Sequence, residues 1–310
     1  MNYTLHQLEV FYKVSEKQSI TKASEELHLT QPAVSIQLKN FQEQFPIALT
    51  EVVGRKLYIT DFGREIAEVA ERILNEAEAI NFKMRSYGGA LTGRLKISVV
   101  STGKYVMPYF LSGFMHTHTE VDLLMDVTNK LQVVESLEKN EVDFALVSVL
   151  PNHLKLNNVA LMPNILHMVA NPKYYEKIRL SKKTGVGDTP LIFREFGSAT
   201  RGAMEGYLKE REIILGKKIE LTSNEAVKQA VLAGLGCSVM PLIGIKNGLQ
   251  SGKLKIFPMK KLPIITTWNL VWLQKKKLSP VATAFLEYIE NEKNQIINAD
   301  FKWLEAYGNN

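Results

Sequence analysis

The sequence predicts an α/β protein with an N-terminal domain that is rich in α-helix. Three observations lead to this fold class. Between Leu5 and Phe41 the apolar residues recur at helical spacing in three short sets. The segment that follows the N-terminal domain has apolar residues at alternating spacings of four and three. From Arg94 onward, apolar strands alternate with helical segments, which is the pattern of a parallel sheet covered by helices.

Length and composition exclude several classes of protein. The 310 residues correspond to two or three domains at roughly 100–200 residues each. Hydrophobic residues make up 45% and charged residues 23%, so the chain can fold around real cores. No apolar run approaches the ~18 residues that span a bilayer, and Met1–Thr4 lacks a signal-peptide pattern. We therefore expect a cytoplasmic protein without a membrane partner.

The second and third helical sets indicate a helix-turn-helix. The three sets are Leu5, Leu8, Tyr12, then Ile20, Ala23, Leu27, then Val34, Leu38, Phe41. A short turn precedes the third set, where Thr30 suits an N-cap and Pro32 suits the first helical turn. The opposite face of this helix carries hydroxyl groups, an amide, a cation and an apolar side chain. Such a combination can contact base edges, thymine methyl groups and phosphates of DNA. We predict DNA contacts from Thr30, Gln31, Pro32, Ser35, Ile36 and Lys39.

A wing should follow this helix-turn-helix. Residues 50–53 and 57–60 read as two short strands around the basic turn Gly54-Arg55-Lys56. The net charge of residues 1–60 does not indicate DNA binding, because six Lys and Arg are balanced by six Asp and Glu. The prediction of DNA binding therefore depends on pattern, with Arg55 and Lys56 as the phosphate contacts of the wing.

A long helix that begins after Thr60 or Asp61 should join two chains. Its apolar residues follow a heptad pattern and its remaining positions are mostly charged, so it has little to bury except the same seam on another chain. Gly88-Gly89 should end it. We predict a dimerisation seam made of Ile66, Ala70, Ile73, Ala77, Ile80, Met84 and Tyr87.

The rest of the chain predicts two α/β lobes and a ligand site between them. Strands at 95–100, 121–125 and 144–147 alternate with helices near 105–116 and 130–139, and the alternation recurs from 165 to 257. The strand at 268–273 and a helix near 279–292 return to the first sheet. Open sheets bind ligands beyond the carboxyl ends of their strands. We predict an effector site formed by Ser101, Thr102, Lys104, Thr128, Asn129, Thr200 and Arg201.

Two of these polar segments have a purely structural alternative. The hydroxyls of Ser101 and Thr102 follow a strand where a helix should begin, so capping explains them equally well. The spacing of Thr222 and Glu225 fits a capping box, which makes Glu225 a structural residue. By contrast, the hydroxyls and guanidinium around Thr200 and Arg201 favour an anionic ligand.

Together these residues resemble the LysR-type family of bacterial transcription regulators. The similarity is strongest at 19–35 and 54–64, whereas 46–52 departs from the family pattern. The resemblance implies a winged helix-turn-helix at 1–62, a linker helix at 63–91 and an effector domain at 92–310, like the type 2 periplasmic binding proteins. It places lobe I at 92–164 and 266–310 and lobe II at 165–265. It also implies double-stranded DNA, a small-molecule effector, RNA polymerase and a second copy of the chain, in a dimer or tetramer, as partners.

Within this family, the segments 99–105, 194–201 and 223–231 are similar to regulators of carbon dioxide fixation (Calvin cycle) operons. The sequence therefore predicts a regulator whose DNA binding or activation responds to a small anionic metabolite.

A two-lobed solute-binding protein and a metabolic enzyme are the alternatives. The first leaves residues 1–90 unexplained. The second lacks a nucleophile elbow, a dinucleotide fingerprint and a phosphate loop, so we predict no catalytic residues and no cofactor. His116-Thr117-His118 has no neighbouring ligands at suitable spacing, and Cys237 is the only thiol, so no metal site is predicted. A redox role for Cys237 stays open.

Overall fold

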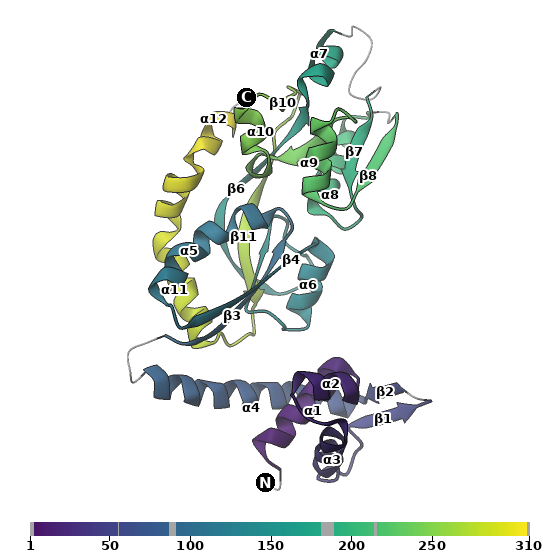
Figure 1. Ribbon diagram of the computed structural model, residues 1–310, viewed down its shortest axis with the longest axis vertical. Coiled ribbons are helices and arrows are strands. Elements are labelled where there is room, and N and C mark those ends of the chain that lie inside the picture. Colours follow the sequence, from purple (N-terminus) through teal and green to yellow (C-terminus); the bar gives the residue numbers. More distant parts are fainter. Residues whose placement is uncertain (1–2, 55, 87–90, 181–188, 214–215, 309–310) are drawn as a thin grey trace. The chain divides into compact units, whose positions relative to one another are not determined.

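The computed structural model describes residues 3–54, 56–86, 91–180, 189–213 and 216–308, without the side chains of 75, 78–86, 180 and 308. The chain forms two compact units, Met1–Ala90 and Leu91–Asn310 (Figure 1). Each unit has its own core and is described separately.

Three helices form the N-terminal core. They are α1 Leu5–Lys17, α2 Ile20–Glu26 and α3 Gln31–Gln42. Thr4 begins α1 with a capping box, in which the Gln7 amide donates to Thr4 Oγ1 at 3.2 Å and the Thr4 amide donates to Gln7 Oε1 at 2.9 Å. The predicted third set is confirmed, since α3 buries Val34, Leu38 and Phe41.

The predicted stripe of α1 is wrong at its start. Leu5 is 51% exposed, whereas Leu8 of the predicted set is buried, together with Val10, Phe11 and Val14. Helix α3 and the long helix α4, Asp61–Ser86, both contact α1. The buried face of α1 is therefore wider than the single stripe that the sequence predicted.

The wing is a two-stranded antiparallel hairpin. Strands β1 Thr50–Val53 and β2 Lys56–Ile59 pair with Thr50 opposite Ile59. Helix α4, Asp61–Ser86, follows directly. Thr60 Oγ1 caps it by accepting from the Gly63 amide at 2.9 Å, and it also donates to the Ala48 carbonyl at 2.7 Å. The cap therefore ties the start of α4 to the chain that enters the wing.

Part of the predicted dimerisation seam has another role. Ala70 has no exposed surface, and Ile66 and Ile73 pack against the core that α1 and α3 build. For Ala70 the prediction of a seam facing a second chain is corrected, because α1 packs against α4 within the same chain. Ile66 and Ile73 are only partly buried, so their place in the seam stays a prediction. Ala77 is partly buried. The side chains of Ile80, Met84 and Tyr87 lie outside the described residues.

One seven-stranded mixed sheet runs through the C-terminal unit. Its order is β10-β6-β11-β5-β3-β4, with β9 also on β6. The predicted parallel arrangement is confirmed where β3 pairs with β4 and β5, and β11 returns to this sheet antiparallel to β5. The strands are β3 Gly93–Val100, β4 Val121–Thr128, β5 Phe144–Val147, β6 Leu156–Ala170, β9 Ser238–Pro241, β10 Lys255–Ile256 and β11 Ile264–Leu273.

The second lobe differs from the predicted repetition of the first. Strands β6 and β11 are long, antiparallel partners that continue from one lobe into the other, so the expected boundaries 164/165 and 265/266 fall inside paired strands. There, β7 Leu191–Arg194 and β8 Lys218–Leu221 form a short parallel pair, and Leu191 also makes an isolated parallel bridge to Cys237. The two lobes are therefore joined by one long antiparallel strand pair, whose register shifts once, between Trp268 and Asn269.

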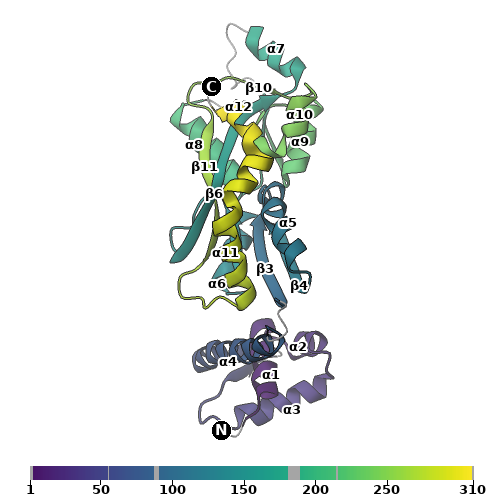
Figure 2. The same ribbon diagram turned by 90° about the vertical axis from the view of Figure 1, so that its left-hand side faces the viewer.

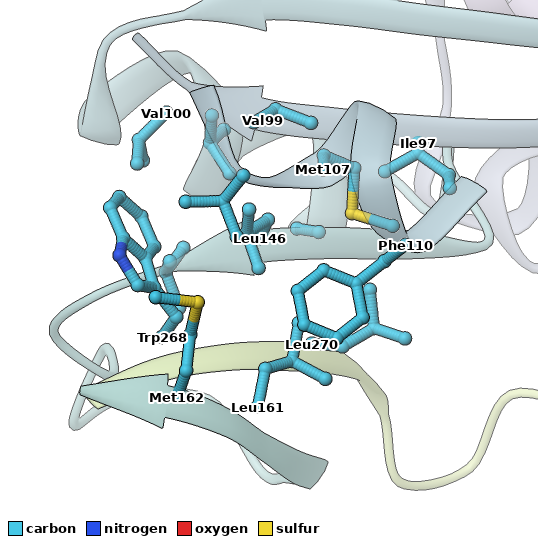
Figure 3. Close-up of a cluster of buried hydrophobic side chains, with 14 of the residues drawn as sticks. Ile97, Val99, Val100, Met107, Phe110, Leu146, Leu161, Met162, Trp268 and Leu270 are labelled. Carbon is cyan, nitrogen blue, oxygen red and sulfur yellow. The ribbon is translucent and has the colours of Figure 1, made fainter. Parts of the chain in front are cut away.

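Helices cover both lobes. In the first lobe the 3-10 helix η1 Gly103–Tyr105 and α5 Met107–Thr117 follow β3, and α6 follows β4. Figure 3 shows the core beneath them, where Phe110, Leu146, Leu270 and Trp268 pack together. The remaining helices are α6 Lys130–Glu138, α7 Pro172–Leu180, α8 Ala199–Glu210, α9 Asn224–Leu232, η3 Leu242–Gly244, α10 Lys246–Gln250 and α11 Pro280–Ile296.

The C-terminal segment connects the two lobes along one side. Helix α11 packs on the first lobe, and the chain continues through η4 Ile297–Phe301 and η5 Lys302–Leu304 to α12 Glu305–Gly308 at the second (Figures 1 and 2). The Phe301 ring stacks on Phe110 at 6.0 Å. At the far end, His167 Nε2 lies 3.0 Å from the Tyr307 carbonyl oxygen, to which it donates.

Candidate functional site

The outer face of α3 has the polar composition that the sequence predicted. Thr30 is its N-cap, with Oγ1 accepting from the Ala33 amide at 3.4 Å. Gln31, Pro32 and Lys39 are exposed, Ile36 is 58% exposed, and Ser35 is half-buried. Because α3 follows α2 after a short turn and buries its opposite face, this surface has the geometry of a recognition helix.

One feature limits the positive charge of this surface. The Lys39 ammonium lies 3.8 Å from Glu43 Oε1, a weak pair between exposed side chains. In the wing, Lys56 is exposed, and Arg55 lies outside the described residues. The wing also exposes Val52 and Val53, so it has an apolar surface beside its cation.

The predicted effector residues of the first lobe gather at the carboxyl end of β3. Thr102 is buried, and Ser101 and Lys104 are half-buried. Thr102 makes no side-chain capping bond to η1, and α5 has no side-chain cap either. The capping alternative is therefore wrong for Thr102, whose hydroxyl stands where a ligand in an open sheet would bind.

Thr128 and Asn129, after the neighbouring strand β4, have structural partners. Asn129 is the N-cap of α6 and accepts from the Gln132 amide at 3.0 Å. Thr128 Oγ1 donates to the side chain of Gln132. These two residues order the start of α6, and a contact with a ligand would have to compete with those bonds.

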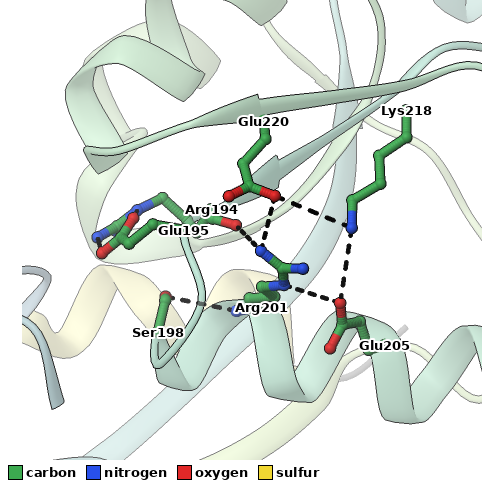
Figure 4. A network of polar contacts seen from close by, with 7 residues as sticks. All are labelled: Arg194, Glu195, Ser198, Arg201, Glu205, Lys218 and Glu220. Atoms are coloured by element: carbon green, nitrogen blue, oxygen red, sulfur yellow. Dashed lines mark hydrogen bonds and ion pairs between the residues drawn. The ribbon is translucent and has the colours of Figure 1, made fainter. Parts of the chain in front are cut away.

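The predicted guanidinium of the second lobe is already neutralised (Figure 4). Arg201 Nε donates to Glu205 at 2.8 Å and Nη1 to Glu220 at 2.9 Å, and Nη1 also donates to the Arg194 carbonyl at 3.1 Å. The Arg201 side chain is 13% exposed. It links α8 to the ends of β7 and β8, which weighs against Arg201 as a direct ligand contact. Thr200, in the first turn of α8, is buried.

Sequence reasoning missed two residues that join the lobes. Tyr105 OH, in the first lobe, donates to Glu225 Oε2 in the second at 3.4 Å. Burial raises the pKa of Tyr105, Glu225 raises it further, and the Arg194 charge opposes both. The capping-box interpretation of Glu225 is wrong, because Ser223 is the N-cap of α9 and its hydroxyl accepts from the Ala226 amide at 3.1 Å.

Two buried N–H donors have no partner within the described part of the chain. One is Nε1 of Trp268, which is fully buried and lies beside Val100 (Figure 3). The other is Nδ2 of Asn224, next to Glu225 in α9. Unpartnered buried donors are rare and call for a ligand or an ordered water.

Other candidate sites are weaker. Two cavities of the described chain, of about 230 and 340 Å³, lie near Lys209 and Tyr307, and neither is lined by a predicted effector residue. The described residues include no group of three or more potential metal ligands and no helix long and apolar enough to cross a membrane. Cys237 is buried, and burial raises the pKa of its thiol to about 12, which opposes a reactive thiolate.

A DNA-binding winged helix-turn-helix followed by a two-lobed binding domain defines the class of ligand-responsive DNA-binding regulators. Residues 5–64 match the family described as bacterial regulatory helix-turn-helix protein, lysR family, and residues 88–293 match the LysR substrate binding domain. The chain therefore belongs to the LysR family of bacterial transcription regulators, which confirms the predicted family and sets aside the enzyme and solute-binding alternatives.

Relatives confirm the predicted similarity to regulators of carbon dioxide fixation. The RuBisCO operon transcriptional regulator of Allochromatium vinosum is 35% identical over 94% of this chain and 97% of its own length. The transcriptional activator CmpR of Synechocystis is 32% identical over 93% and 95%. Among solved structures, the regulatory domain of Synechocystis CcmR in complex with 2-PG is 30% identical, with a TM-score of 0.58 over 64% of this chain and 96% of that one.

Proposed function

We propose that this regulator controls genes of carbon dioxide fixation in response to a small phosphorylated acid. The 35% identity to a RuBisCO operon regulator, over nearly the full length of both chains, carries this proposal. The related regulatory domain bound to 2-PG supports the ligand class, and we take 2-phosphoglycolate, which has a phosphate and a carboxylate, as the test compound. DNA, reached in the cytoplasm, is the macromolecular partner.

On the DNA side, α3 enters the major groove and the wing contacts the backbone. Gln31, Ser35 and Ile36 read base edges and methyl groups, while Thr30 and Lys39 contact phosphates. Pro32 sets the first turn of α3. Lys56 and Arg55 are the proposed backbone contacts of the wing.

On the effector side, the ligand binds between the lobes, at the carboxyl end of β3. Ser101, Thr102 and Lys104 supply hydroxyls and a cation from the first lobe, and the start of α8 at Thr200 supplies backbone donors from the second. Thr128 and Asn129 form the edge of the site. Arg201 acts indirectly, by fixing α8.

The regulator works as a homo-oligomer. Ala70 is buried within its own domain, so pairing of two chains depends on the other residues of the predicted seam, which are Ile66, Ile73, Ala77, Ile80, Met84 and Tyr87. A ligand that binds one arrangement of the lobes better than another then changes the spacing of paired DNA-binding domains and their contact with RNA polymerase.

A mobility-shift titration tests this function. Full-length protein should bind its own upstream DNA specifically, and 2-phosphoglycolate should change the affinity or the footprint. Lys39→Ala should weaken binding to all sequences and reduce the salt slope by about one, because one phosphate contact is lost. The control Lys173→Ala, an exposed lysine of the second lobe, should leave both unchanged. An unaltered salt slope in Lys39→Ala would remove that residue from the interface.

A further inference from the structure

Arg194 is a buried arginine whose only charged partner in the described chain is the next residue. It ends β7 and is 4% exposed. Its Nε donates to Glu195 Oε2 and its Nη2 to Glu195 Oε1, both at 2.7 Å. This is the two-pronged geometry in which a guanidinium binds any carboxylate or phosphate.

The pair lies at the junction of the lobes. In Figure 4 the side chains of Arg194 and Glu195 extend away from the network around Arg201. The Arg194 charge acts on the phenol of Tyr105 in the first lobe, where it opposes the rise of pKa that burial and Glu225 cause. Lys104 precedes Tyr105, with its ammonium 5.1 Å from the centre of that ring. Two cations from opposite lobes therefore lie close to Tyr105, at the end of β3 where the effector is proposed to bind.

Glu195 is placed so that it can leave Arg194. Its carboxylate comes from the first residue after β7 and is 18% exposed, so it can turn toward solvent without unfolding a helix or strand. The following residues form an exposed turn, with Phe196 78% exposed and Gly197 at a positive φ of 83°. Arg201, by contrast, is held by two carboxylates and a carbonyl from three separate elements.

We propose that Arg194 is the anion-binding arginine of the effector site, and that Glu195 occupies it as an internal carboxylate until the phosphate or carboxylate of the effector takes its place. The location of the site rests on the proposed function. The exchange also explains how binding reaches the other lobe. A Cβ on Gly197 would lie 2.6 Å from Leu131 of α6, so the turn that carries Glu195 touches the first lobe. A displaced Glu195 shifts this contact.

Titration of charge variants tests the exchange. The full chain is titrated with 2-phosphoglycolate and with inorganic phosphate by calorimetry, and its binding to upstream DNA is measured in parallel. Glu195→Gln keeps the shape of the side chain but removes the competing charge, so it should bind both probes at least about tenfold more tightly than wild type. Glu176→Gln is the matched control, because Glu176 pairs with Arg179 on the surface of α7 at 2.9 Å and should leave affinity unchanged.

The double variant Arg194→Gln, Glu195→Gln leaves no unpaired buried charge and therefore separates binding from folding. It should unfold near the wild-type midpoint and bind at least about tenfold more weakly than Glu195→Gln. The inference would be overturned if wild type and Glu195→Gln bound the two probes with equal affinity. It would also be overturned if Glu195→Gln and the double variant did so. It would also be overturned if wild type and Glu195→Gln bound neither probe while specific DNA binding persisted. Loss of specific DNA binding by wild type would contradict the proposed function instead.

Discussion

Two substitutions on α3, one on each face, should separate folding from DNA recognition. Phe41 is fully buried, and its ring lies 5.4 Å from Tyr3, 5.1 Å from Phe11 and 5.0 Å from Phe45. Phe41→Ala leaves a cavity among these rings and should cost about 3–5 kcal/mol of unfolding free energy. At about 1.4 kcal/mol per tenfold, the folding equilibrium constant of the N-terminal unit falls by a factor of roughly 10² to 4 × 10³.

Ile36, on the opposite face, gives the matched comparison. Its side chain is 58% exposed, so Ile36→Ala should change the unfolding free energy by no more than about 0.5 kcal/mol. The same substitution removes the apolar tip that faces a thymine methyl, so operator binding should fall while folding does not.

Hydrogen exchange of the full-length protein, followed by mass spectrometry, measures both effects locally. The amides of residues 31–42 should exchange much faster in Phe41→Ala and at the wild-type rate in Ile36→Ala, whereas amides of the effector domain should be unaffected in both. Mobility shift then reports DNA binding. If the amides of residues 31–42 exchanged as fast in Ile36→Ala as in Phe41→Ala, the assignment of the two faces of α3 would be wrong. If Ile36→Ala bound the operator with wild-type affinity and specificity, Ile36 would have no role in recognition.

Three further predictions concern single residues. The Cys237 thiol should resist a disulfide reagent at about pH 8 in the native protein and react once on unfolding, because burial raises its pKa to about 12; fast native labelling would contradict this. Burial lowers the pKa of the His167 imidazole in the folded protein, so below about pH 6.5 the unfolded chain binds a proton more readily than the folded one. The free energy of unfolding should therefore be highest above about pH 6.5 and should decline below it. In urea titrations His167→Gln should weaken that decline, and an identical pH profile would refute the role of His167. Ala70→Asp should unfold the N-terminal unit, whereas Val69→Asp, at an exposed position, should leave its urea midpoint near wild type; equal losses would contradict the packing of α4.

The helix-turn-helix and wing were predictable because their signals are local. Thr30 and Pro32 mark the start of α3, and Gly54 marks the turn of the wing, within a few residues of what they determine. Ala70 shows the limit of such signals. A heptad pattern says that one face of α4 must be covered, but whether α1 or a second chain covers it depends on tertiary packing.

The roles of the two arginines could not be predicted from the sequence. Arg194 and Arg201 lie in one short segment, each with a carboxylate nearby in sequence. What distinguishes them is Glu220, nineteen positions beyond Arg201, which the parallel pairing of β7 and β8 brings within hydrogen-bond distance. The Tyr105–Glu225 contact, over 120 positions, likewise has no local signature.

The long strands β6 and β11 determine how the two lobes can move. A flexible linker would allow free rotation, but ten residue pairs hold these strands together, with one shift of register between Trp268 and Asn269. A change of lobe angle must therefore be taken up as added twist over many peptide units, or concentrated where the register shifts, next to the unpartnered indole of Trp268. Such a connection resists a change of lobe angle along its whole length. We therefore expect the lobes to return to one resting angle when ligand leaves, and we expect the energy needed to twist β6 and β11 to limit how far a ligand can move the lobes.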